Sequence, residues 1–239
     1  MQRLLIAASA LLLLANSPRE DALALIEQGK MGEAIELIRQ AADAGDVEAM
    51  TFLGMSYEKG QDVAANPATA ATYYRMAADR GDPYAQWRLG IMIDSGAVEG
   101  SPEQAVELFR KAADQGNTGA MASLAVMLAA GKGLPQDFAE ARRNYEMAAR
   151  KGNAHGLQGL GVLHLEGQGV PQDKVEAMAL WLVALSAGDM VASANFQKIS
   201  YGLNDDEVHA INKRANAIAT EYGYEAQFTP WRDYKPEAN

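Results

Sequence analysis

Glycine recurs along this chain at a nearly constant spacing, and this feature constrains the fold more than any other. One series advances in steps of 36, 35, 36 and 36 residues, at Gly45, Gly81, Gly116, Gly152 and Gly188. Two further series keep the same spacing: Gly54, Gly90, Ala125 and Gly161, and then Gly60, Gly96, Gly131 and Gly167. A period of this size indicates a solenoid, in which each unit buries its apolar face against the next one.

Each period contains the start and stop signals of two helices. The first helix follows an N-cap residue, whose side chain can accept from free backbone N–H groups: Asp46, Asp82, Asn117, Asn153 or Asp189. This helix ends near Gly60, Gly96, Gly131 or Gly167, because glycine readily takes the left-handed conformation of a helix C-terminus. The second helix starts at Asn66-Pro67, Ser101-Pro102, Asp137 or Asp173. Three residues after their caps, Gln104, Glu140 and Glu176 predict capping boxes.

The periodic small and large residues predict how the helices pack. Residues without a bulky side chain share one face of the first helices: Ala49, Ala85 and Ala120 with Gly54, Gly90 and Ala125. A neighbouring helix can approach such a face closely. Large side chains recur at one point of the second helices, at Tyr74, Phe109, Tyr145 and Trp181. We therefore predict that these rings fill the space left by the small residues.

The repeated units share the pattern AAxxGxxxAxxxLGxxYxxGxGVxxD. It is clearest in residues 148–173 (AARKGNAHGLQGLGVLHLEGQGVPQD) and 112–137. This pattern resembles the Sel1-like repeat, a relative of the tetratricopeptide repeat, and the resemblance covers about residues 21–202. It implies an all-α fold, an α/α superhelical solenoid of helix–turn–helix repeats that serves as a binding scaffold and is not generally an enzyme. The usual tyrosine of the first helix is kept as Tyr57 but is replaced by Ile93, Leu128 and His164.

The pattern divides the chain into three parts. Residues 1–24 are predicted to be a signal peptide, and residues 25–203 a solenoid of four to five repeats: 25–45 (partial), 46–81, 82–116, 117–152 and 153–188. Residues 204–239 are predicted to form a C-terminal capping helix, to about Tyr222, and an aromatic tail. Its rings are those of Tyr222, Tyr224, Phe228, Trp231 and Tyr234. They either fold back over the last repeat or form a partner-binding tail.

The amino-terminal segment has the features of an export signal. One basic residue, Arg3, precedes twelve uncharged and mostly apolar residues at positions 4–15. This stretch is shorter than the about 20 residues that span a bilayer, and Ala22-Leu23-Ala24 offers a small-x-small cleavage site. We therefore expect cleavage after Ala24, a periplasmic or secreted protein and no membrane span afterwards. The alternative is an uncleaved anchor or the first helix of the fold.

Composition excludes several classes of function. The chain has no cysteine, which excludes disulfides and thiol catalysis. Its net charge of −10 argues against nucleic-acid binding, which depends on clustered Lys and Arg. His155, His164 and His209 lack zinc-site spacing, so neither a metal nor another cofactor is expected. Ser56-Tyr57-Glu58-Lys59 matches the SxxK of penicillin-interacting enzymes, but neither SDN nor KTG follows.

We therefore predict a monomeric, non-catalytic scaffold, adaptor or regulator in the bacterial periplasm that binds a protein or peptide. A cell-wall-related or β-lactamase-like hydrolase, acting on peptidoglycan or β-lactams, is the alternative. Candidate partner-binding residues lie on the first helices where the repeat does not fix them: Glu48, Phe52, Met55, Tyr84, Trp87, Arg88, Ile91, His155 and Val162. Several are of types enriched at interfaces, although the same side chains could belong to the inter-repeat core or to scattered surface.

Overall fold

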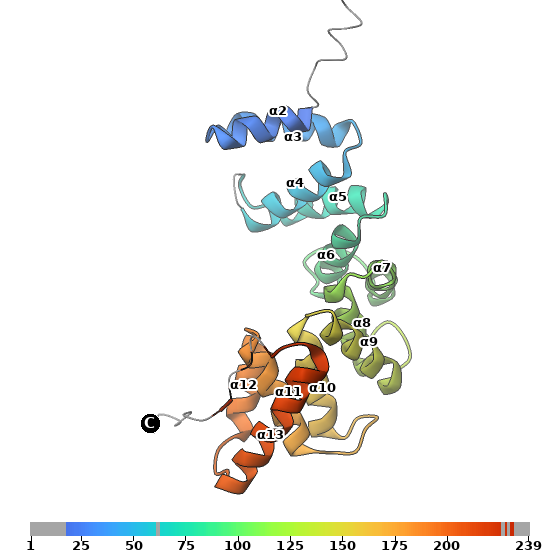
Figure 1. Cartoon of the computed structure of the whole chain (residues 1–239). Helices are drawn as coiled ribbons and strands as arrows, with labels where there is room; N and C mark the ends of the chain where they lie inside the picture. Colours follow the sequence, from blue (N-terminus) through green and yellow to red (C-terminus); the bar gives the residue numbers. More distant parts are fainter. Residues whose placement is uncertain (1–17, 61–62, 226–227, 229, 232–239) are drawn as a thin grey trace, which may run out of the picture. The chain divides into compact units, whose positions relative to one another are not determined.

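The computed structural model describes residues 18–60, 63–225, 228, 230 and 231, and every regular element among them is a helix (Figure 1). The predicted all-α fold is therefore confirmed. The apolar stretch at positions 4–15 and Tyr234 lie outside the described residues. The chain divides into two compact units, residues 1–99 and 100–239, and each is described by itself.

The first unit consists of helices that pack in chain order. They are α2 (Pro18–Glu27), α3 (Met31–Asp43), α4 (Val47–Lys59), α5 (Pro67–Ala78) and α6 (Pro83–Asp94). Each contacts the next, and α4 also contacts α6. The buried side chains of this unit combine many alanines with large apolar residues, among them Met50, Leu53 and Tyr74. Such neighbour-to-neighbour packing is the arrangement of a solenoid.

The second unit continues the same arrangement. It consists of α7 (Pro102–Asp114), α8 (Thr118–Ala130), α9 (Phe138–Arg150), α10 (Ala154–Glu166), α11 (Lys174–Ser186), α12 (Met190–Ile199) and α13 (Asp205–Tyr222). Consecutive helices pack together from α7 to α12, and α13 packs on α11. Helix α13 is the predicted terminal helix, and it ends at Tyr222 as expected. Its buried residues are Ile211, Ala215, Ile218 and Ala219.

The helix starts follow the predicted cap chemistry. The N-cap side chain accepts from a backbone N–H of the first turn at every predicted position: Asp46, Asn66, Asp82, Ser101, Asn117, Asp137, Asn153, Asp173 and Asp189. Of the three predicted capping boxes, the reciprocal pair forms at Ser101 and Gln104. For α9 and α11 the N-cap side chain accepts from the backbone N–H of Glu140 or Glu176, but no return hydrogen bond from the glutamate side chain is present. The prediction of a full capping box is wrong for these two helices. Glu176 instead accepts a hydrogen bond from Arg214 of α13, which draws its carboxylate away from its own helix start.

Two of the periodic glycines, Gly54 and Gly161, meet aromatic rings as predicted. A Cβ added at Gly54 would lie 2.6 Å from Cδ1 of Tyr74, and one added at Gly161 would lie 2.3 Å from Nε1 of Trp181. The indole of Trp181 is 2% exposed and donates to the carbonyl of Gln158, which lies 2.9 Å away. The absence of a side chain at each glycine is therefore what lets the second helix place its ring against the first.

The described part of the aromatic tail packs on the end of the second unit, as one of the two interpretations predicts. The buried Tyr224 donates its hydroxyl to the carbonyl of Ala149. The ring of Trp231 packs edge-on against Phe196 of α12, with centroids 5.0 Å apart, and its backbone N–H donates to Asn212. These contacts join the tail to α9, α12 and α13.

Candidate protein-binding surface on α4 and α6

Seven of the nine partner-binding candidates lie on two helices of the first unit, α4 and α6. Glu48 is exposed, and the other six are half-buried: Phe52, Met55, Tyr84, Trp87, Arg88 and Ile91. The remaining two candidates, His155 and Val162, are on α10 in the second unit. Because α4 and α6 contact each other, the repeat places these candidates on adjacent helices.

The centre of this region is an ordered group of side chains around Trp87. The ring of Tyr84 meets the indole edge-on, with centroids 5.7 Å apart, and the guanidinium of Arg88 lies 5.2 Å from the indole centroid. Tyr84 in turn lies 6.4 Å from the ring of Tyr74 on α5. Aromatic and cation–π pairs of this geometry hold rings in fixed orientations. We call Tyr84, Trp87 and Arg88 the α6 cluster.

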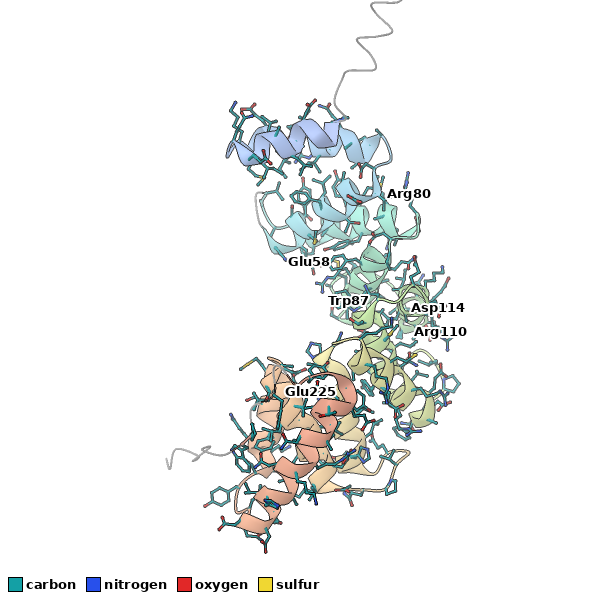
Figure 2. All side chains as sticks on the ribbon, in the orientation of Figure 1. Glu58, Arg80, Trp87, Arg110, Asp114 and Glu225 are labelled. Carbon is teal, nitrogen blue, oxygen red and sulfur yellow. The ribbon has the colours of Figure 1, made fainter. Side chains whose placement is uncertain are left out.

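Glu58 fixes the α6 cluster to the neighbouring helices. Its carboxylate accepts hydrogen bonds from Arg88 of α6 and, at 2.7 Å, from the hydroxyl of Tyr74 of α5; Figure 2 labels Glu58 and Trp87. The side chains of Arg88 and Glu58 are 23% and 22% exposed, so water weakens this ion pair only in part. Burial raises the pKa of Tyr74, and its hydrogen bond to Glu58 raises it further. The phenol therefore keeps its proton and remains a donor.

A second ordered group, which the sequence did not suggest, joins α3, α4 and α5. Arg39 donates to the hydroxyl of Tyr57 over 2.8 Å, and the ring of Tyr57 stacks on that of Tyr73, with centroids 5.8 Å apart and planes 8° apart. Only Tyr57 belongs to the repeat pattern. Arg39 and Tyr73 occupy positions that the pattern leaves free, so periodicity alone could not have pointed to them.

Two of the candidates on α4, Phe52 and Glu48, line a separate apolar pocket. They face Ala22, Leu23 and Ile26 of α2. The structure therefore places Phe52 beside α2.

His155 belongs to a different environment in the second unit. Its side chain is 65% exposed, and Nδ1 lies 2.5 Å from Oδ2 of Asp189, a buried residue that caps α12 through its other oxygen. The contact joins the starts of α10 and α12. The repeat pattern points to His155 but gives no sign that Asp189 is its partner.

The residues of the SxxK match are poorly placed for catalysis. Ser56 is 5% exposed and lies on the buried side of α4, whereas Lys59 is exposed at the end of the same helix. A nucleophile has to reach its substrate, so this geometry does not favour the hydrolase alternative. Within the described residues, no group of three or more His, Asp or Glu side chains could hold a metal ion.

Across the part of the chain that the structure describes, no helix is both long enough and apolar enough to cross a membrane.

Comparison with known families identifies the repeat. A profile of the Sel1 repeat matches residues 26–46, 47–82, 83–117, 118–153 and 154–189. The chain belongs to the Sel1 repeat family. Each matched segment begins one residue later than the corresponding repeat drawn from the sequence. Proteins with these repeats generally mediate interactions between proteins and are generally non-catalytic.

Solved structures of bacterial proteins share the fold. The chain is similar to c5321, a protective antigen present in uropathogenic Escherichia coli strains that displays an SLR fold, with 26% identity and a TM-score of 0.77 over 99% of this chain and 52% of that one. It is also similar to a Sel1 repeat protein from Oxalobacter formigenes, with 28% identity and a TM-score of 0.67 over 84% of each chain.

A curated relative matches over a shorter stretch. DAP3-binding cell death enhancer 1 of Rattus norvegicus is 36% identical over 63 residues, which are 26% of this chain and 12% of that protein. The chain thus spans about half the length of c5321 and a small part of the rat protein.

Proposed function

We propose that this Sel1 repeat protein is a non-catalytic adaptor or regulator of the bacterial periplasm that binds a protein or peptide through the α6 cluster. Membership of the repeat family supports binding as the activity. The basic residue, apolar stretch and small-x-small site of residues 1–24 support export.

The observation that carries the proposal is the order of the α6 cluster at a half-exposed position. Trp87 and Arg88 are of the residue types that dominate binding energy at interfaces. Both are held by their neighbours, Trp87 by Tyr84 and Arg88 by Glu58. Binding through side chains that are already ordered costs less conformational entropy. The cluster therefore has the composition and rigidity of an interface anchor.

Crosslinking capture in the producing bacterium tests the proposal. Tagged wild-type protein is compared with Trp87→Ala and with Tyr201→Ala, which removes a ring that is 90% exposed in the second unit. We expect Trp87→Ala to recover at least one wild-type partner about tenfold less, as the loss of an anchor residue implies, and Tyr201→Ala to recover it normally. Circular dichroism verifies that both variants are folded. Normal recovery of every partner by Trp87→Ala would refute the assignment of this surface.

Fractionation and a hydrolysis assay examine the other parts of the proposal. We expect the protein in the periplasmic fraction, and recovery in the cytoplasm alone would contradict export. Wild-type protein and Ser56→Ala are incubated with nitrocefin and with peptidoglycan. Turnover by wild-type protein that Ser56→Ala abolishes would support the hydrolase alternative instead.

A further inference from the structure

Helix α2 is connected to α3 by the same turn that connects other helices of the array. It is followed by a left-handed glycine, Gly29, with a φ of 74°. The backbone N–H of Gly29 donates to the carbonyl of Ile26, and that of Lys30 donates to the carbonyl of Leu25, each over 2.9 Å. An equivalent pair of hydrogen bonds closes the turn between α5 and α6. Helices α2 and α3 are therefore joined as a regular part of the repeat structure.

Helix α2 also covers an apolar surface of the two helices that follow. It packs on α3 (Figure 1), with Ala22 1% exposed and Ile26 half-buried. Its exposed side chains are Leu23 and the acidic Asp21 and Glu27, among others. A solenoid needs terminal elements that cover its core and present a polar outer face, and α2 has this role at the start of the array. The residues that it faces on α3 and α4 are Ile38, Ala41, Ala49 and Phe52.

The small-x-small site at Ala22-Leu23-Ala24 lies inside this helix. Cleavage after Ala24 would remove the first seven of its ten residues. The three that remain, Leu25, Ile26 and Glu27, are fewer than one helical turn. The apolar side chains beneath α2 would then face solvent, and the stabilisation that comes from their burial would be lost.

A second small-x-small site precedes the helix. Ala15-Asn16-Ser17 lies directly at the end of the apolar stretch, and small residues of this kind mark the site of a signal peptidase. The charged residues Arg19, Glu20 and Asp21 separate it from Ala22-Leu23-Ala24. A cut at the earlier site leaves all of α2 in place, beginning at Pro18. Proline is well suited to the first position of a helix, because no hydrogen bond is lost there.

We infer that the exported chain is processed at Ala15-Asn16-Ser17 in place of Ala22-Leu23-Ala24, with the cut after Ala15 or after Ser17. The mature protein then keeps α2 as the first helix of its array. The inference rests on the proposed export, because a chain meets the signal peptidase only when it crosses the membrane.

The mass of the exported protein tests the inference directly. The full chain is expressed in the producing bacterium, and its product in the periplasmic fraction is examined by intact mass and amino-terminal sequencing. We expect a chain that begins at Asn16 or at Pro18 and still contains Ala22. A chain that begins at Leu25, or an exported chain that still begins at Met1, would overturn the inference while export itself stands. Recovery of the protein in the cytoplasm alone would contradict export, so the two failures are distinguishable.

Matched variants locate the cut independently. A double variant, Ala15→Gln with Ser17→Gln, replaces both small residues of the earlier site, and Ala24→Gln makes the same change at the later site. Ala24 is exposed and glutamine is a good helix former, so this variant keeps α2 intact. We expect pulse labelling to show loss of the wild-type cut in the double variant and wild-type processing of Ala24→Gln. Processing blocked by Ala24→Gln, or unchanged in the double variant, would refute the assignment.

Hydrogen exchange of the exported protein tests whether α2 is folded in the mature chain. We expect its amides to exchange more slowly than those of a synthetic peptide of the same residues, because α2 is packed on α3. Exchange as fast as that of the peptide would overturn the role of α2 as the first helix of the array.

Discussion

At the scale of single residues, the packing of glycine against an aromatic ring is the strongest constraint on this fold. We predict that Gly161→Ala lowers the free energy of unfolding by about 1–3 kcal/mol, because overpacking a core shifts side chains and backbone. Nε1 of Trp181, 2.3 Å from the added methyl group, would have to move and strain its hydrogen bond to Gln158. Urea denaturation measures the change.

Gly32→Ala is the matched control for that variant. Gly32 is also helical, but no heavy atom lies within 4 Å of its added Cβ. Alanine there should stabilise the protein by up to about 1 kcal/mol through helix propensity. Equal destabilisation by the two substitutions would contradict the packing explanation.

A second residue-scale prediction concerns alkaline pH. Burial raises the pKa of Tyr145 to about 12, against about 10 in an unfolded chain. Below pH 10 both states hold the proton and the stabilisation is fully present. Between pH 10 and 12 only the unfolded state loses the proton, so the free energy of unfolding falls, by up to about 3 kcal/mol for this group. We expect Tyr145→Phe to lose less stability than wild-type protein in urea titrations from pH 9 to 12, and an unchanged slope would refute the assignment.

At the scale of elements, Glu58 joins three helices through one carboxylate. We predict that Glu58→Gln lowers the free energy of unfolding by about 1.5–3 kcal/mol, the range for hydrogen bonds to charged groups. The uncharged amide of glutamine can no longer neutralise the guanidinium of Arg88 while it accepts the hydrogen bond from the hydroxyl of Tyr74. Thermal unfolding gives the measurement. Glu107→Gln is the control, since Glu107 pairs with Lys111 on an exposed helix face and should leave the melting temperature almost unchanged.

The tail is a second element whose role can be measured. Trp231→Ala should destabilise the protein by about 1–3 kcal/mol, because the ring that covers Phe196 is lost. Deletion of residues 223–239 should have a larger effect, because it also removes the buried Tyr224. Both are compared by urea denaturation, and partner capture is measured in parallel. Unchanged stability together with a lost partner would favour the binding-tail interpretation.

These elements also show which parts of the structure could be predicted from the sequence. The bounds of the helices depend on local chemistry. An N-cap residue such as Asp137 and the glycines of the neighbouring turns were therefore sufficient to predict where the helices begin and end. The pair of Glu58 and Arg88 could not be predicted, because 30 residues separate them and neither position is fixed by the repeat. Glu176 was assigned to its own helix start for a similar reason, since its partner Arg214 lies 38 residues away, in the capping helix.

At the scale of the whole molecule, a repeat array transmits a local change mainly to adjacent repeats, because stability is approximately a sum of repeat and nearest-neighbour terms. Gly54→Ala disturbs Tyr74 in the first unit, and Gly161→Ala disturbs Trp181 in the second. We expect hydrogen exchange to accelerate in α4 and α5 for the first variant and in α10 and α11 for the second, with smaller changes in the adjoining helices. The amides of α10 and α11 should keep their wild-type rates in Gly54→Ala, and those of α4 and α5 in Gly161→Ala. If either variant accelerated exchange equally in both units, the chain would unfold as one cooperative body, and the additive description of its repeats would be wrong.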